Sequence, residues 1–319
     1  MFILSYYEIS YQYPHLLGII LPLPILHGFF LYWYTLQTTG KSISTTSVMW
    51  HLIPFVLLTT LAVPFYMLPA SEKLYVFRNA GKGFEWYSLI QNALFVIVGL
   101  SYSIASVVRL KKYRKKVLNT FSNTEKGTLL WLEYISYGFA IVWLVAYPTP
   151  DQYLFTGVAF FVLFIGAFGI NRTDVFIPSI QKEDSETTPA KYQKSGLNSS
   201  DTVKLSDQLR SFMEKNKPYK NANLTLDELA EMMQINSNQL SQVINGQEGR
   251  TFYHYVNSFR IREFLVASAT ADSRKFTYAG LANECGFQSK TTFNKYFKME
   301  TGKTPSDYFQ SLPLEIAVA

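Results

Sequence analysis

The sequence predicts an all-α chain in which a multi-span transmembrane helical bundle precedes a separate domain of short helices. The first half is strongly apolar and rich in aromatic residues, whereas the second half has an ordinary soluble composition. One arrangement of two short helices and a turn also occurs twice near the C-terminus. With 319 residues, the chain is long enough for two domains, each with its own core.

Five apolar stretches approach the roughly 20 residues that a helix needs to cross a bilayer. Tryptophan and tyrosine cluster near their ends, as is typical of membrane proteins. A buried helix of a soluble protein is the alternative for any single stretch, but five of them favour a membrane domain over residues 1–170. The predicted spans are 16–36, 49–68, 89–108, 128–147 and 152–170.

The basic residues indicate the orientation of these spans. Six of the 29 basic residues lie in the run RLKKYRKK (109–116), which we expect to be a loop between the third and fourth spans. Because lysine and arginine are retained on the cytoplasmic side, this loop and the C-terminal domain should lie in the cytoplasm. We therefore expect a multi-pass protein of the inner (cytoplasmic) membrane. Three basic residues in the predicted external loop 69–87 run against this orientation.

Polar residues and prolines interrupt the predicted spans. Pro22 and Pro24 lie in the first span, and His27 and His51 place polar groups at membrane depth. Such groups usually face a bundle interior or a cavity. They are consistent with a pocket for a small ligand, or with kinked helices joined by hydrogen bonds and no ligand.

A change of composition marks a linker. Residues 171–200 are rich in charged residues, serine and threonine, and show no sustained helical period. A flexible coil of this length spans on the order of 30 Å. The domain that follows, 201–319, should therefore reach beyond the lipid headgroups.

The first helix pair has clear start signals. An amphipathic helix is predicted over 205–216. Thr225 and Glu228 then have the spacing of a capping box, and Asn236 and Gln239 repeat it for the next helix. The second helix of the pair directs Leu240, Val243 and Ile244 to one side and amides and hydroxyls to the others, which is typical of a helix-turn-helix.

A second pair repeats this plan. Thr277 is the predicted cap of its first helix, and Gly286 occupies a turn that favours a left-handed backbone. The following helix should bury Phe293, Tyr296 and Phe297. A predicted helix over 251–269 joins the pairs and is about 28 Å long, so the two second helices are held roughly one DNA turn apart.

These residues resemble an AraC-type transcription regulator over about 220–311. The most specific stretches are LTLDELAEMMQINSNQLSQVING, FYHYVNSFRIREF and ANECGFQSKTTFNKYFKMETGKTPSDYF. The whole chain also resembles a bacterial subgroup in which such a domain follows a multi-span membrane domain, usually of seven spans. Five are visible here, so either two are missing from the start or this member differs. The positions that match the family motif of the second pair are Gly286, Phe287, Phe297, Lys298, Gly302, Lys303, Thr304 and Pro305.

Two residues depart from the family pattern. Gly280 stands where the family often has an acid that completes a capping box, which should weaken that helix start. Gln234 stands at a turn position where residues more tolerant of positive φ are usual. Neither departure removes the predicted fold.

The resemblance implies binding of double-stranded promoter DNA by the second helix of each pair. Amide side chains bond adenine and lysine bonds guanine, so we expect bases to be read by residues of these types. Residues 200–319 carry 14 basic and 13 acidic residues, so non-specific attraction to DNA should be modest. The expected base-reading residues are Asn238, Gln239, Gln242, Lys290, Thr291 and Asn294. Lys298 and Thr304 are expected at phosphates, and Ser289 and Lys295 complete the predicted DNA-binding set.

The predicted function is a membrane-anchored, sequence-specific transcription regulator whose membrane domain senses a ligand or positions the DNA-binding domain. The alternative is a membrane receptor or transporter whose helical cytoplasmic tail binds a partner protein. We expect no enzyme, no cofactor and no metal site, because no nucleotide loop, catalytic dyad or metal-ligand cluster is visible and Cys285 is the only cysteine. A homodimer and an unidentified ligand of the membrane domain are open as further partners, beside DNA and the lipid bilayer.

Overall fold

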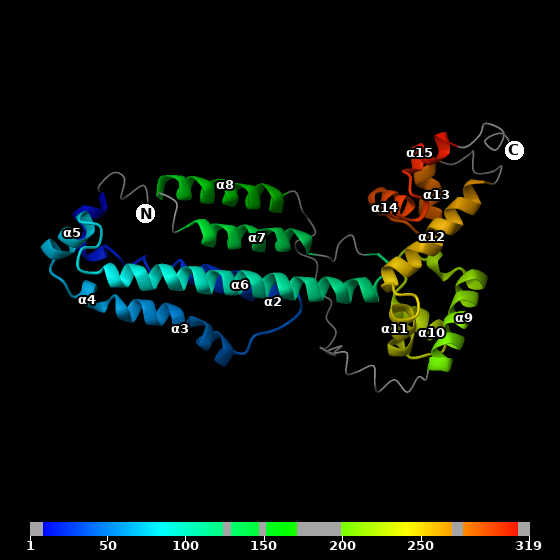
Figure 1. The fold of residues 1–319 in the computed structure, drawn as a ribbon, viewed down its shortest axis with the longest axis horizontal. Coiled ribbons are helices and arrows are strands. Elements are labelled where there is room, and N and C mark those ends of the chain that lie inside the picture. Colours follow the sequence, from blue (N-terminus) through cyan, green and yellow to red (C-terminus); the bar gives the residue numbers. More distant parts are fainter. Residues whose placement is uncertain (1–8, 124–128, 147–150, 171–198, 270–276, 312–319) are drawn as a thin grey trace. The chain divides into compact units, whose positions relative to one another are not determined.

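The computed structural model describes residues 9–123, 129–146, 151–170, 199–269 and 277–311. The regular structure of these residues is helical apart from one isolated antiparallel bridge between Phe121 and Thr225, which confirms the all-α fold class for the described part of the chain. The chain divides into two compact units (Figure 1). The first unit comprises residues 1–112 and 129–182, and the second comprises residues 113–128 and 183–319.

Apolar helices dominate the first unit. Contacts join α2 to α3 and to α7, and α7 to α8. The elements in chain order are η1 (Ile9–Gln12), η2 (Pro14–Leu16), α2 (Ile25–Thr38), α3 (Thr45–Leu61), α4 (Val63–Tyr66), α5 (Ala70–Arg78), α6 (Glu85–Thr120), α7 (Leu130–Val145) and α8 (Asp151–Ile170). The last part of α6, from residue 113, belongs to the second unit.

The predicted first span, 16–36, starts too early. Residues 17–24 form turns, and α2 begins only at Ile25, because Pro22 and Pro24 cannot donate the backbone hydrogen bonds of a helix interior. The Gln91 side chain donates to the Leu21 carbonyl over 3.1 Å, which satisfies one carbonyl of this non-helical segment. The predicted second span, 49–68, is not one helix either, because it is divided between α3 and the short α4.

The basic run predicted to be a loop is helical. The predicted third span, 89–108, lies inside α6, which continues through 109–116 and ends at Thr120. The loop prediction is wrong because Leu110 and Val117, one on each side of most of the cations, are both buried. They give this end of the helix an apolar stripe. Arg109 turns back toward the end of α2, where its Nε donates to the Thr39 hydroxyl over 2.9 Å.

Small residues allow close packing in the first unit. A Cβ atom at Gly99 of α6 would collide with the ring of Trp143 on α7, and one at Gly138 of α7 would collide with the ring of Phe161 on α8. Glycine at such crossings is typical of helices that pack within a bilayer, where close contact drives association.

One described helix, α6, is long and apolar enough to cross a membrane by length and composition. Three further apolar helices are shorter, namely Thr45–Leu61, Leu130–Val145 and Tyr153–Ala167. Four of the five predicted spans therefore overlap one of these apolar helices, and the first predicted span overlaps α2, which is not among them. Only α6 passes this test within the described residues.

The second unit continues with short helices around two cores. Its elements after α6 are α9 (Ser199–Asn216), η5 (Pro218–Lys220), α10 (Leu226–Met232), α11 (Ser237–Gly246), α12 (Phe252–Ser268), α13 (Tyr278–Glu284), α14 (Lys290–Thr301) and α15 (Pro305–Gln310). One core joins α9, α10, α11 and the start of α12, and the other joins the rest of α12 to α13 and α14. The predicted amphipathic face over 205–216 is confirmed, since Leu205, Leu209 and Met213 are buried in the first core. Most of the predicted linker, residues 171–198, lies outside the described residues.

Candidate nucleic-acid interface

Both helix pairs begin with a capped helix. The Thr225 side chain accepts from the Glu228 N–H over 3.2 Å, and the Glu228 carboxylate accepts from the Thr225 N–H over 2.9 Å, so the predicted capping box of α10 is confirmed. Asn236 and Gln239 form the predicted box of α11. Thr277 caps α13 through the Gly280 N–H over 3.1 Å, without the return bond that an acid at residue 280 would supply.

The turns within the pairs use left-handed backbone. Gln234 has φ +58° and Gly286 has φ +96°. A Cβ atom at Gly286 would lie 2.5 Å from the Tyr219 carbonyl oxygen and 2.9 Å from Arg260 Nε. Glycine is therefore required at residue 286 both by backbone geometry and by the close approach of η5 and α12.

α11 is fixed by its apolar face. Leu240, Val243 and Ile244 are fully buried, as predicted. Of the predicted base-reading residues, Asn238 is exposed, whereas Gln239 and Gln242 are half-buried. The Gln239 side-chain oxygen already accepts from the Asn236 N–H over 3.3 Å, so part of its hydrogen-bonding capacity is committed to the cap.

α14 presents the more open polar face. Phe293, Tyr296 and Phe297 are buried in the second core, as predicted. The helix starts at Ser289, whose hydroxyl accepts from the Thr292 N–H over 3.3 Å. The predicted contact residues Lys290, Thr291, Asn294, Lys295 and Lys298 are all exposed on this helix. A polar, mainly basic surface therefore covers one side of α14.

Thr304 lies at the start of α15 rather than on α14. Its hydroxyl donates to the Asp307 carboxylate over 2.6 Å and accepts from the Asp307 N–H over 3.3 Å. This hydroxyl is thus used by the cap of α15, and the phosphate contact predicted for Thr304 stays a prediction.

α12 holds the two pairs together. It has 17 residues, which corresponds to about 26 Å, and ten of them are buried. It contributes Phe252, Tyr255, Val256 and Phe259 to the first core and Ile261 and Phe264 to the second. The predicted joining helix over 251–269 is confirmed, with Thr251 as its cap.

Arg260 is the polar centre of α12. Its side chain is 2% exposed and contacts no carboxylate among the described residues. Burial lowers the pKa of Arg260 to about 10, so the guanidinium remains charged at neutral pH. Its N–H groups donate to the carbonyl oxygens of Tyr219, Asn221, Ala222 and Ser122, to the Ser122 hydroxyl and to the Asn257 side chain.

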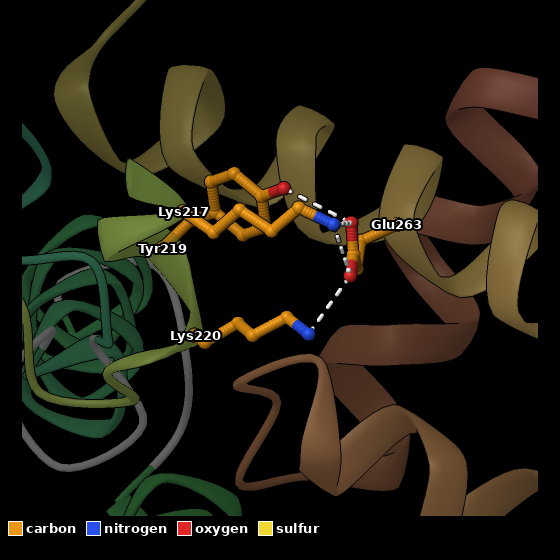
Figure 2. Close-up of polar contacts among 4 residues, drawn as sticks. All are labelled: Lys217, Tyr219, Lys220 and Glu263. Atoms are coloured by element: carbon orange, nitrogen blue, oxygen red, sulfur yellow. Dashed lines mark hydrogen bonds and ion pairs between the residues drawn. The ribbon is translucent and has the colours of Figure 1, made fainter. Parts of the chain in front are cut away.

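A second polar cluster fastens η5 to α12 (Figure 2). The Glu263 carboxylate accepts from Lys217 and Lys220, at 2.9 and 2.8 Å, and from the Tyr219 hydroxyl at 3.1 Å. Burial opposes ionisation of Glu263, but the hydrogen bonds from Lys220, Lys217 and Tyr219 outweigh it and lower the pKa of Glu263 to about 2. Burial, followed by the nearby Glu263 charge, raises the pKa of Tyr219.

The segment after α6 belongs to this unit and was not predicted to contact it. The Ser122 N–H donates to the Leu224 carbonyl over 3.1 Å, and Phe121 forms the isolated bridge with Thr225. The Asn123 amide bonds the Gln288 side chain, which in turn donates to Asn223 over 3.1 Å. Among the residues of these contacts, only Arg260 could have been singled out from the sequence. It is a charged residue four positions from both Val256 and Phe264, on a helix face that is otherwise apolar.

Comparison with known proteins decides the kind of domain that this geometry forms. Residues 229–311 match the family model of a helix-turn-helix domain. The match begins within α10 and covers the rest of both helix pairs and α12, and it supports an AraC-type DNA-binding transcription regulator. No curated protein and no solved structure matches the chain significantly. In the part of the chain that the structure describes, no group of three histidine, cysteine, aspartate or glutamate residues is placed to hold a metal ion.

Proposed function

We propose that this chain is a membrane-anchored regulator that reads promoter DNA in a sequence-specific manner with α11 and α14. The observation that carries the proposal is the exposed polar face of α14, which lies opposite a buried aromatic face. This helix lies within the residues that match the helix-turn-helix family model. Such a helix can enter a major groove, where side chains contact base edges.

We assign the two roles within this surface by position and chemistry. Lys290, Thr291 and Asn294 occupy the first turns of α14, which is the part that contacts bases in helix-turn-helix proteins. Asn238 occupies the equivalent start of α11, with Gln239 and Gln242 farther along. The remaining residues contact phosphates, which set the register without reading the sequence. They are Ser289, Lys295, Lys298 and Thr304.

Membrane anchoring is supported by the outer surface of the first unit. Large apolar side chains on its helices are exposed to an extent that is unusual for a soluble protein, whereas lipid would cover them. Six of the most exposed are Met49 (67%), Trp50 (69%), Ile97 (61%), Ile141 (59%), Phe160 (69%) and Leu163 (67%). On this proposal α2, α3, α7 and α8 cross the inner membrane together with α6.

The orientation is supported by the end of α6. The cations of 109–116 follow its apolar part, and Phe121–Asn123, just after α6, contact the helix pairs of the second unit, which we call the DNA-binding unit. This end of α6 and the DNA-binding unit therefore lie on one side of the membrane, and the positive-inside rule makes that side the cytoplasm. The first unit would sense a small molecule and alter the DNA-binding unit.

Selection of bound duplexes from a random library tests this function. The full chain, in detergent micelles and at one fixed salt concentration, should enrich a reproducible motif with two elements about one DNA turn apart. The mass of the protein–DNA complex distinguishes one bound copy from a homodimer. Retention of duplexes without sequence preference would rule the function out.

A further inference from the structure

A cavity of about 250 Å³ lies within the first unit, among α4, α5 and the start of α6. Five of the eleven residues that line it are aromatic, namely Phe65, Tyr66, Phe77, Phe84 and Tyr87. An apolar cavity of ~150 Å³ holds benzene, and drug-sized ligands need ~300 Å³ or more. The volume therefore suits a molecule of about ten non-hydrogen atoms.

One polar group in this cavity lacks a partner. Tyr87 is 5% exposed, and its buried hydroxyl has no hydrogen-bond partner among the described residues. The hydroxyl of Tyr66, which also lines the cavity, donates to the Gly18 carbonyl over 3.1 Å. Buried hydroxyls are nearly always hydrogen-bonded, so the Tyr87 hydroxyl is left with hydrogen-bonding capacity for a bound polar group.

The lining also determines the charge of the ligand. None of the described residues that line the cavity carries a formal charge, although Lys73, Arg78 and Lys82 lie nearby in the sequence. An ionised ligand would lose its hydration without gaining an ion pair. The lining therefore favours an uncharged ligand over an ionised one.

We propose that this cavity binds a small, uncharged aromatic molecule with one hydrogen-bonding group, of the size of a substituted phenol. The proposal rests on the sensing role proposed for the first unit. The aromatic rings would hold the apolar body of the ligand, and the Tyr87 hydroxyl would bond its polar group.

Fluorine NMR of 4-fluorophenol and fluorobenzene, added to the full chain in detergent micelles, tests the proposal. We expect saturable binding of both probes, with 4-fluorophenol bound about tenfold more tightly because it bonds Tyr87. Tyr87→Phe should remove this difference and leave fluorobenzene binding unchanged. Ala62→Phe places a ring in the cavity and should abolish saturable binding of both probes, which controls for partition into the micelle.

Three results would overturn the proposal even if the probes bind. They are saturable binding that survives Ala62→Phe, a phenol preference that survives Tyr87→Phe, and displacement of the probe by added phospholipid, which would make bilayer lipid the occupant. Retained sequence-specific DNA binding by each variant shows that it is folded. If the probes do not bind but sequence-specific DNA binding is intact, only the proposed ligand site is ruled out. If the probes bind but the chain shows no DNA sequence preference, the proposed function is ruled out.

A separate observation concerns Phe121–Asn123, which we call the docking segment. It contacts the start of the first helix pair at Leu224 and Thr225, and the turn of the second pair at Gln288. Ser122 is 1% exposed and accepts two hydrogen bonds from Arg260. One short segment, joined directly to α6, therefore bridges both helix pairs.

We infer that the docking segment fixes the orientation of the two helix pairs, so that the position of α6 controls how well both pairs bind one DNA site. Two linked reading helices gain affinity from each other only when their geometry lets both engage at once. Since α6 is continuous from Glu85 to Thr120, a shift of this helix would move the docking segment.

The inference is tested in the full chain with two duplexes. One carries both elements of the selected motif, and the other carries one element with the second replaced by unrelated sequence. The measured quantity is the ratio of the affinities for the two-element and the one-element duplex. Asn123→Ala removes the contact to Gln288, and Ser122→Pro removes both the N–H that bonds Leu224 and the hydroxyl that accepts from Arg260. Both variants should bind the two-element duplex about tenfold more weakly and the one-element duplex as before. An unchanged ratio, an equal loss on both duplexes, or tighter binding to the two-element duplex would contradict the inference.

Discussion

Arg260 Nη1 lies 3.0 Å from the Ser122 carbonyl oxygen, and Nη2 lies 3.1 Å from the Ser122 hydroxyl oxygen. The residue that completes the hydrogen bonding of this buried guanidinium thus lies two positions after the end of α6, although Ser122 and Arg260 are 138 positions apart. Cys285 is a convenient reporter for this region, because it is the only cysteine of the chain and is buried in the second core. Its rate of labelling by 4,4′-dithiodipyridine measures the free energy of opening of the DNA-binding unit.

Arg260→Lys should destabilise the DNA-binding unit by about 2–4 kcal/mol. A lysine carries its three donors on one nitrogen and cannot reach the carbonyl groups that the guanidinium serves. Labelling of Cys285 in increasing urea measures the loss. Arg262→Lys, at an exposed position on the same helix, is the matched control and should stay within about 0.5 kcal/mol of the parent chain. Similar losses in both variants would contradict the role assigned to Arg260.

Gly286→Ala should cost about 3 kcal/mol or more, because it adds a left-handed alanine and a collision with the Tyr219 carbonyl. Gly302 provides the comparison, since its φ is +77° but a Cβ atom there would meet nothing within 4 Å. Gly302→Ala should therefore cost only about 1 kcal/mol. The same labelling assay compares the two, with each rate referred to that of the urea-unfolded chain. Equal costs would show that the close approach of η5 is unimportant.

Gly280→Glu should stabilise the DNA-binding unit by about 0.5–1 kcal/mol. A glutamate at this third position of α13 would accept from the Thr277 N–H and complete the capping box that Thr225 and Glu228 form in α10. It would also remove a glycine from a helix. Gly280→Ala separates the two effects, since it removes the glycine without adding a carboxylate. A glutamate variant no more stable than the alanine variant would exclude the box.

Acid should weaken the contact between η5 and α12. The folded-state pKa of Glu263 is lowered to about 2, against about 4.3 in an unfolded chain, so the unfolded chain binds the proton more readily. The stabilisation from Glu263 is therefore complete above about pH 5 and is lost as the pH falls from about 4.3 to about 2. Cys285 labelling at a series of pH values should show this loss in the parent chain and a flatter profile in Glu263→Gln. Parallel profiles would mean that Glu263 is not the titrating group.

The local features of the second unit could be predicted from the sequence because they depend on neighbouring residues. The capping boxes at Thr225 and Asn236 and the turn at Gly286 are set by spacings of a few residues. The docking of Ser122 against Arg260 depends on contacts between distant parts of the chain, which no local period reveals.

The errors in the first unit have different causes. The late start of α2 at Ile25 follows from Pro22 and Pro24. The sequence therefore indicated where this helix begins, but a span defined by hydropathy alone includes the residues before it. The helical basic run could not be distinguished from a loop by charge alone. Its buried Leu110 and Val117 become visible only when the packing partners are known.

The exposed face of α14 should determine which sequence is bound. Replacing Lys290 and Asn294 together with alanine removes a donor to guanine and an amide that bonds adenine, each expected to contribute about 1–3 kcal/mol of discrimination. The fold should remain intact, because both side chains are exposed, and Cys285 should stay protected. Lys215→Ala, at an exposed lysine of α9, is the matched control for the loss of positive charge.

The most direct measurement is the motif enriched by each of these chains from the same random duplex library at one salt concentration. We expect the parent chain and Lys215→Ala to enrich the same two-element motif, and the double variant to lose preference in one element only. An identical motif from all three chains would contradict the reading role of α14.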